Sequence, residues 1–220
     1  MRNPLKLLPV ILLLSLFLNN SSSGGNSQPV KGSKLPFINL PMPKNPNEKK
    51  YLGLSGDGFF NINQIKTKAV LIKIFNLYCP VCQSTAAAMA ELYHQIEENP
   101  DLKDKIKLIG IGAGNSLLEV EVFKQTNHIP FPVFPDEDFT IHKVLGEVRT
   151  PFFIATRMNR DGSHEIVHTH LGALVEVQAF LDLMVEAYGI HQDDLQKKKN
   201  LATSTANESS SNDELELRVR

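Results

Sequence analysis

The 220-residue sequence contains no tryptophan and only two cysteines, and its positive and negative charges nearly cancel. Two cysteines cannot form the disulfide framework that stabilises many small secreted domains, so the fold must depend on a hydrophobic core. Hydrophobic residues make up 42% of the chain, which is enough for such a core. The net charge of -1 gives no reason to expect a nucleic-acid partner. The length fits one domain with extensions, or at most two domains.

The sequence also has little that resembles a transmembrane helix, which needs ~20 apolar residues. Its N-terminal apolar stretch, residues 7–18, is interrupted by a proline and a serine and is preceded by Arg2 and Lys6. Asn, Ser and Gly residues follow it. This layout is typical of a secretory signal, so we expect residues 1–20 to be a signal peptide, with an N-terminal membrane anchor as the alternative. An exported protein would work outside the cytoplasm.

Composition divides the remainder of the chain into three parts. Residues 21–33 are rich in Ser, Gly and Asn and are expected to form a linker. A folded domain is expected over residues 34–190, with a polar loop broken by prolines at 41–50. Residues 191–220 are polar and rich in Ser and Lys, which predicts a disordered tail.

Apolar runs and helical periodicities alternate along residues 34–190. They predict an α/β fold whose sheet is covered by helices on both faces. The expected strands are 35–40, 69–76, 106–113, 131–134, 151–156 and 165–171, and the expected helices are 80–98, 116–126, 139–145 and 175–188.

The two cysteines form a C-x-x-C motif, Cys79-Pro80-Val81-Cys82, where a buried strand meets a helix. Amides at the helix start would favour a thiolate at Cys79, the expected nucleophile. Cys82, one turn further on, would resolve the mixed disulfide, and Pro80 and Val81 would tune the redox potential. A structural disulfide would close a very small loop and stabilise little. A zinc site would need two more ligands at suitable spacing.

Several further motifs accompany the cysteine pair. They are Leu35 to Leu40, Phe131-Pro132-Val133 with Asp136, Val148 to Ile154 with its Thr-Pro, and the late Asp161-Gly162 turn. Together they make residues 34–190 similar to redoxins of the TlpA and ResA type. The resemblance implies a thioredoxin-like fold with a central mixed β-sheet flanked by helices on both faces.

The same resemblance implies a function and further site residues. Pro151 would be a cis proline lying against the dithiol, and Thr150 would offer backbone hydrogen bonds to a bound substrate. The expected enzyme is a monomeric thiol-disulfide oxidoreductase that acts on protein substrates, needs no cofactor, and exchanges electrons with a membrane-linked thiol reductant or oxidant. The resemblance further implies a place in the periplasm or at the extracytoplasmic face of a bacterial membrane, and a role in cytochrome c maturation or general thiol reduction.

Two residues near the site depart from the family pattern. Lys73 stands where thioredoxins commonly have a buried aspartate, and where the TlpA-like proteins have a neutral residue. A buried lysine there would favour a thiolate electrostatically. Tyr78 replaces the tryptophan that usually precedes the first cysteine.

Alternative functions remain open. His164, His168 and His170 suggest a metal site, although solvent-facing positions on a hairpin are the simpler interpretation, and no metal is expected. A copper metallochaperone similar to the Sco proteins would use the two cysteines and a histidine, but those proteins space their cysteines C-x-x-x-C. A peroxiredoxin-like peroxidase would need P-x-x-x-T/S-x-x-C before Cys79, which is absent. A binding domain without turnover would need neither thiol.

Overall fold

The computed structural model describes residues 27–190. The expected signal peptide and the expected C-terminal tail therefore lie outside the described residues and stay predictions. Within the described part, no helix has the length and apolar character that crossing a membrane requires.

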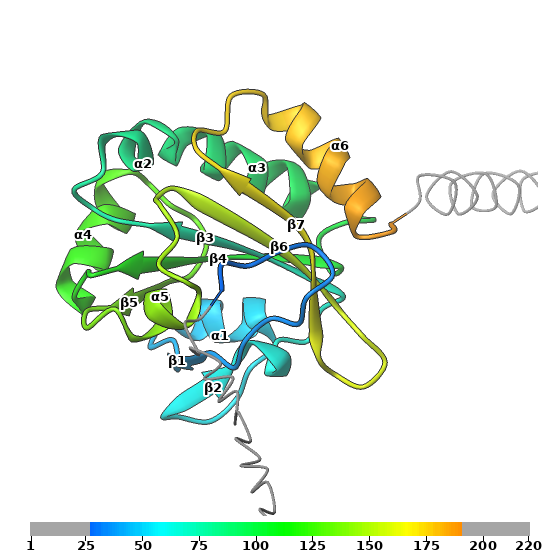
Figure 1. The fold of residues 1–220 in the computed structure, drawn as a ribbon, viewed down its shortest axis with the longest axis horizontal. Coiled ribbons are helices and arrows are strands. Elements are labelled where there is room, and N and C mark those ends of the chain that lie inside the picture. The colour runs from blue at the N-terminus through cyan, green and yellow to red at the C-terminus, as the bar shows by residue number, and fades with distance from the viewer. Residues whose placement is uncertain (1–26, 191–220) are drawn as a thin grey trace, which may run out of the picture.

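A five-stranded sheet with the strand order β5-β4-β3-β6-β7 forms the centre of the fold (Figure 1). β3, β4 and β5 run parallel, whereas β6 pairs antiparallel with both β3 and β7, so the sheet is mixed as expected. Five of the six predicted strands match the strands of this sheet to within about two residues at each end. Their bounds are β3 Ala69–Phe75, β4 Ile106–Ala113, β5 Val133–Asp136, β6 Phe152–Met158 and β7 His164–Leu171.

The expected strand at residues 35–40 is shorter and belongs to a second sheet. β1 (Asn39–Pro41) pairs antiparallel with β2 (Phe59–Asn61), and a 3-10 helix, Ile62–Gln64, follows. The prediction of a loop at 41–50 is wrong, because α1 occupies Pro46–Leu52. Its proline stands in the first turn, where a missing amide costs no hydrogen bond, so this proline starts a helix rather than breaking one.

One predicted helix is divided in two. Instead of a continuous helix over 80–98, α2 covers Pro80–Ser84 and α3 covers Ala86–Glu98, with Thr85 at the junction. α4 (Leu117–Thr126) begins at the predicted Ser116, whose side chain forms a capping box with Glu119. The remaining helices are α5, Thr140–Val144, and α6, Val177–Ala187.

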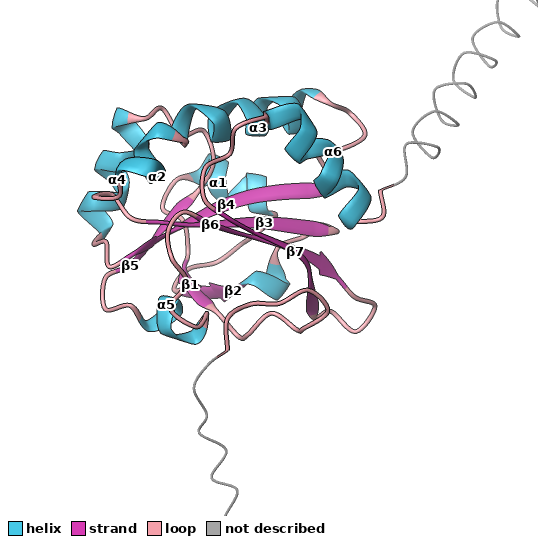
Figure 2. Cartoon of the chain, turned by 45° about the horizontal axis from the view of Figure 1, so that its top comes forward, coloured by secondary structure: helices cyan, strands magenta, loops and turns pink. Residues whose placement is uncertain are grey.

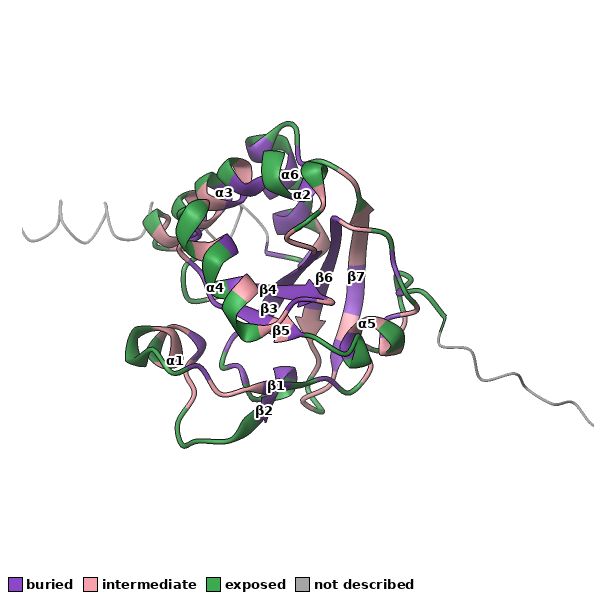
Figure 3. Cartoon of the chain, turned by 90° about the vertical axis from the view of Figure 1, so that its left-hand side faces the viewer, coloured by how far each residue is buried: buried purple, intermediate pink, exposed green. Residues whose placement is uncertain are grey.

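Each face of the central sheet has its own hydrophobic core, since alternate strand residues point to opposite faces. α2, α3, α4 and α6 cover one face (Figure 2), and β1, β2, α1 and α5 cover the other (Figure 3). The strands at the centre are almost entirely buried (Figure 3). β3 contributes Leu71 and Phe75 to the first core, and Val70, Ile72 and Ile74 to the second.

Part of the segment expected to be a linker contacts the folded domain. The backbone amide of Gly32 donates to the Ile166 carbonyl over 2.8 Å, and the Ile166 amide donates to the Ser33 carbonyl over 2.8 Å. These bonds hold the chain against β7 before the first strand begins.

Candidate functional site

Two asparagines shape the turn that carries the first cysteine. The Asn76 side chain donates to the Ala113 carbonyl over 2.7 Å and accepts from the Tyr78 amide over 2.8 Å. The buried Asn115 side chain accepts from the Leu77 amide over 2.8 Å. The turn after β3 is thereby fixed to the end of β4. Neither asparagine is among the site residues that the sequence predicts, although Asn at the end of a strand is a common turn residue.

Cys79 is the N-cap residue of α2, and the Cys82 amide donates to the Cys79 sulfur over 3.3 Å. The cysteines are free thiols in this structure, Cys79 partly exposed and Cys82 fully buried. A substrate can therefore reach the first sulfur, whereas the second faces the core.

The surroundings of the two thiols shift their pKa values in opposite directions. Partial burial acts to raise the pKa of Cys79, but hydrogen bonds from the Cys82 thiol and amide outweigh it and hold this pKa below its ordinary value. Burial, together with the neighbouring Cys79 sulfur, raises the pKa of Cys82 to about 11. Cys79 is thus the sulfur that ionises first, as a nucleophile must.

The Thr-Pro segment lies beside the first sulfur. The Thr150–Pro151 peptide bond is cis, and the Cys79 thiol lies 3.6 Å from the Thr150 carbonyl oxygen. A cleft of about 350 Å³ opens next to them, and Arg149 and Phe139 also line it. Cys79 and Thr150, which are 71 positions apart in the chain, therefore meet at this cleft.

Lys73 is buried, with 1% of its surface exposed, and lies on β3 beneath the dithiol. Its Nζ donates a long hydrogen bond of 3.4 Å to the Thr85 hydroxyl and lies 5.9 Å from the centre of the Phe123 ring. Burial lowers the pKa of Lys73 to about 8, against the opposing effect of the two cysteines, Cys82 more than Cys79.

The remaining residues of the motif face outward. Tyr78, 71% exposed, donates a hydrogen bond of 2.5 Å from its hydroxyl to Glu119 at the start of α4. Val81 is also exposed, and Pro80 occupies the first turn of α2. The surface around Cys79 is thus partly apolar, as surfaces that contact other proteins often are.

The three histidines do not converge on the cysteines. His164 is buried rather than solvent-facing, and its Nδ1 shares a hydrogen bond of 2.9 Å with the Thr156 hydroxyl. Burial lowers the pKa of His164 to about 4. His170 packs against the Phe153 and Phe180 rings. Within residues 27–190, no group of three or more His, Cys, Asp or Glu residues is arranged to hold a metal ion.

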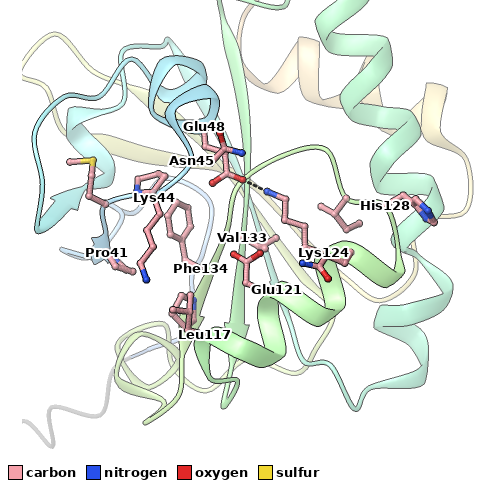
Figure 4. Close-up of a pocket in the computed structure, with 15 residues that line it drawn as sticks. Pro41, Lys44, Asn45, Glu48, Leu117, Glu121, Lys124, His128, Val133 and Phe134 are labelled. Atoms are coloured by element: carbon pink, nitrogen blue, oxygen red, sulfur yellow. Dashed lines mark hydrogen bonds and ion pairs between the residues drawn. The ribbon is translucent and has the colours of Figure 1, made fainter.

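A larger hollow, about 710 Å³, lies away from the thiols between the β1–α1 segment and α4 (Figure 4). Pro41, Leu117 and Phe134 contribute apolar surface to it, and an ion pair between Glu48 and Lys124 crosses it. Neither cysteine lines this hollow, so the candidate redox site is the smaller cleft at Cys79.

Comparison with solved structures shows the fold. The chain is similar to a candidate thiol:disulfide interchange protein DsbE from Chlorobium tepidum (TM-score 0.54, 15% identity, 73% of this chain and 99% of that one). It is also similar to a candidate protein disulfide isomerase from Bacteroides thetaiotaomicron (TM-score 0.55, 15% identity, 73% and 91%). The expected thioredoxin-like α/β fold is confirmed.

Sequence comparison adds a curated relative and a family. Thiol-disulfide oxidoreductase ResA of Halalkalibacterium halodurans is 26% identical over 125 residues, which are 56% of this chain and 66% of the relative, slightly less than two thirds of its length. The family model described as AhpC/TSA matches residues 52–169, more than half of the chain. The matched region contains Cys79, Cys82, Thr150 and Pro151. The resemblance to TlpA- and ResA-like redoxins is thereby confirmed, and the chain belongs to the AhpC/TSA family.

Proposed function

We propose that this protein is a thiol-disulfide oxidoreductase that exchanges disulfides with protein substrates through Cys79 and Cys82. The observation that carries the proposal is the asymmetry of the two sulfurs. The pKa of the partly exposed Cys79 is lowered, and the pKa of the buried Cys82, one helical turn away, is raised. This asymmetry gives the two sulfurs the different roles that dithiol exchange requires.

Reduction of a substrate then takes two steps. The Cys79 thiolate attacks one sulfur of the substrate disulfide, and the other substrate sulfur leaves as a thiolate. Cys82 next attacks the Cys79 sulfur, the Cys79–Cys82 bond forms, and the second substrate sulfur leaves with its electron pair. The protein loses two electrons and the substrate gains them. Oxidation of a dithiol substrate is the same sequence in reverse.

The cleft beside Cys79 supports a binding role for Thr150, which precedes the buried cis proline Pro151. The Thr150 carbonyl lies at the cleft, 3.6 Å from the Cys79 sulfur, where an extended substrate segment can hydrogen-bond to the backbone. Exposed Tyr78, which lines the same cleft, and exposed Val81 add apolar contact near the sulfur. A protein substrate therefore fits this surface better than a small molecule that needs an enclosed pocket.

The place of action follows from the N-terminal pattern at residues 1–20. We assign the protein to the extracytoplasmic side, as a monomer that exchanges electrons with a membrane-linked thiol partner in cytochrome c maturation or general thiol reduction. Deletion of residues 1–20 should then leave the protein in the cytoplasm, whereas the full chain should be recovered from the envelope fraction. Equal distribution of both forms would contradict export.

The reaction is tested by reduction of insulin with dithiothreitol as the electron source. The wild-type protein should accelerate it, and Cys79→Ser should abolish the acceleration. A reduction potential near -270 mV would indicate a reductase, and one near -120 mV an oxidant. Rapid turnover of peroxide without insulin reduction would instead indicate a peroxidase. Copper retained by the purified protein and lost in His168→Ala or His170→Ala would indicate a metallochaperone.

A further inference from the structure

We infer that Lys73 is a positioning residue of the dithiol, whose buried ammonium group is the counterion of the thiolate form at Cys82 when that sulfur resolves the mixed disulfide. The inference rests on the proposed function, because it concerns the second step of the same exchange. It assigns a task to a buried charged residue that the structure otherwise leaves without a charged partner among residues 27–190.

The backbone directs Lys73 toward the dithiol. Lys73 shares a face of β3 with Leu71 and Phe75, whose core also contains Cys82. Its Nζ reaches the Thr85 hydroxyl at the α2–α3 junction, and that hydroxyl donates to the Cys82 carbonyl over 3.1 Å. The lysine is thus connected through one hydroxyl to the helix turn that carries the resolving sulfur.

The polar surroundings of Lys73 are otherwise sparse. Gly110, its neighbour on β4, has no side chain, and Phe153, its neighbour on β6, is apolar. The next ionisable group on this face is His170 on β7, which lies beyond the Phe153 ring. In the described part of the chain, no carboxylate forms an ion pair with Lys73, so the two thiols are the ionisable groups that couple to it.

A buried ammonium group that lacks a carboxylate favours a thiolate nearby, because the opposite charges compensate for the loss of water. Cys82 needs this help, since burial disfavours its ionised form. In the resolving step the Cys82 proton passes to water, and the Cys82 thiolate attacks Cys79. The Cys79–Cys82 bond forms, the Cys79–substrate bond breaks, and the departing substrate thiolate takes up a proton. Lys73 keeps its proton throughout.

Two measurements on Lys73→Met, a variant with a similar shape and no charge, test the inference. The first is the reduction potential in a glutathione buffer at about pH 7 and about pH 9.5. The second is the resolving rate, followed as the coloured thiolate that Cys82 releases from a mixed disulfide between Cys79 and a chromogenic aromatic thiol. Lys107→Met is the matched control, because Lys107 is also buried in the sheet but pairs with Glu97.

Removal of the ammonium group should destabilise the thiolate forms of both cysteines, that of Cys79 in the reduced protein at equilibrium and that of Cys82 in the resolving step. At pH 7 we expect Lys73→Met to lower the equilibrium constant for reduction by glutathione about tenfold, a potential lower by about 30 mV. The resolving rate should fall by about the same factor. Both differences should shrink at pH 9.5, because the wild-type lysine is then mostly neutral. Lys107→Met should behave like the wild type at both pH values.

Three outcomes would overturn the inference. These are a wild-type potential and rate in Lys73→Met, a loss of equal size at both pH values, and an equal loss in Lys107→Met. If Lys73→Met does not fold, Lys73→Gln provides a neutral, polar substitute with the same expected results. Activity retained by Cys79→Ser would instead overturn the proposed function itself. Loss of activity in Cys79→Ser with no effect of Lys73→Met would overturn only the role of the lysine.

Discussion

Two lysines are buried in neighbouring central strands, and their surroundings differ. Lys107, near the start of β4, lies 3.3 Å from a Glu97 oxygen and 4.4 Å from the centre of the Tyr51 ring. Its ammonium group also donates to the Lys103 carbonyl. Lys73, near the end of β3, has one long hydrogen bond to Thr85 and two thiols as its ionisable neighbours.

The difference indicates where the fold tolerates an uncompensated charge. A buried charge that is paired and hydrogen-bonded contributes to structure, whereas one without a carboxylate costs stability and is retained where another benefit offsets the cost. Lys107 contacts Tyr51 of α1 and Glu97 of α3, and so connects elements of the fold. Lys73 lies under the site of chemistry. We therefore expect substitutions at the two ends of the sheet to affect different properties.

The largest effect should come from the cysteines at the Lys73 end. Cys79→Ser should reduce the rate of insulin reduction by at least about a thousandfold, because a serine hydroxyl is not ionised at neutral pH and cannot exchange disulfides. Cys82→Ser should retain the first attack and accumulate the mixed disulfide, which mass spectrometry would detect. If Cys82→Ser turned over like the wild type, the division of roles between the two sulfurs would be wrong.

The second effect concerns the cost of burying the lysine. In a Cys79→Ser, Cys82→Ser background, Lys73→Met should raise the free energy of unfolding by roughly 3 kcal/mol at pH 7. The pKa of Lys73 falls from 10.5 when unfolded to about 8 when folded, so the unfolded chain binds more protons between these values. The stability of the Lys73 form should rise across that range, and the advantage of Met should fade. Urea unfolding at several pH values measures this difference.

A constant difference from pH 7 to pH 10.5 would contradict this account, because it would reflect packing rather than charge. The serine background matters, since thiol ionisation is then absent from the same pH range. Other lysines and tyrosines titrate equally in the two proteins and cancel in the difference.

The sequence predicted the central sheet well, since the strands 69–76 and 106–113 are long apolar runs that only a buried strand explains. The sequence also predicted Cys79 at a helix start, because the C-x-x-C motif follows the first of these apolar runs and a helical periodicity begins there. It failed at residues 41–50, where prolines and lysines suggested a loop. The structure places Pro46 at the first turn of α1, where proline is favoured, and the Asn45 side chain caps the helix.

Other features depend on contacts between distant segments, which a single sequence does not display. Asn115 is a fully buried polar residue, and its partner is the backbone amide of Leu77, 38 residues earlier in the chain. The hairpin pattern predicts a solvent-facing position for His164, but this residue is buried and hydrogen-bonded to Thr156. The helix break at Thr85 was also missed, because the apolar periodicity of residues 80–98 continues across it.

At the opposite end of the sheet from Lys73, Lys107→Met should lower the free energy of unfolding by about 1–2 kcal/mol. The substitution leaves the Glu97 carboxylate, which is only partly exposed, without its cation and removes the contact of that cation with Tyr51. Redox properties should stay unchanged. Glu97→Gln combined with Lys107→Met should recover part of the loss, because no unpaired carboxylate remains. If Lys107→Met instead raised the free energy of unfolding, burial of Lys107 would cost stability as burial of Lys73 does, and the difference between the two lysines would be wrong.

The smallest effect should come from Thr85, the hydroxyl that Lys73 contacts. Thr85→Val keeps the shape but removes hydrogen bonds of 2.9 Å to the Val81 carbonyl and 3.1 Å to the Cys82 carbonyl, and should cost about 1 kcal/mol. Thr85→Ser retains the hydroxyl and separates this loss from that of the methyl group.

Double-mutant cycles then distinguish the two lysines directly. Thr85→Val and Lys73→Met should be coupled by about 0.5–1 kcal/mol, because the hydroxyl accepts the one hydrogen bond that the Lys73 ammonium group donates within residues 27–190. Thr85→Val and Lys107→Met should add independently, since Lys107 hydrogen-bonds to Glu97 and Lys103 instead. Equal coupling in both cycles would mean that Thr85 acts on the sheet as a whole. Coupling with Lys73 alone would show that the lysine and the α2–α3 junction act as one unit beneath the dithiol.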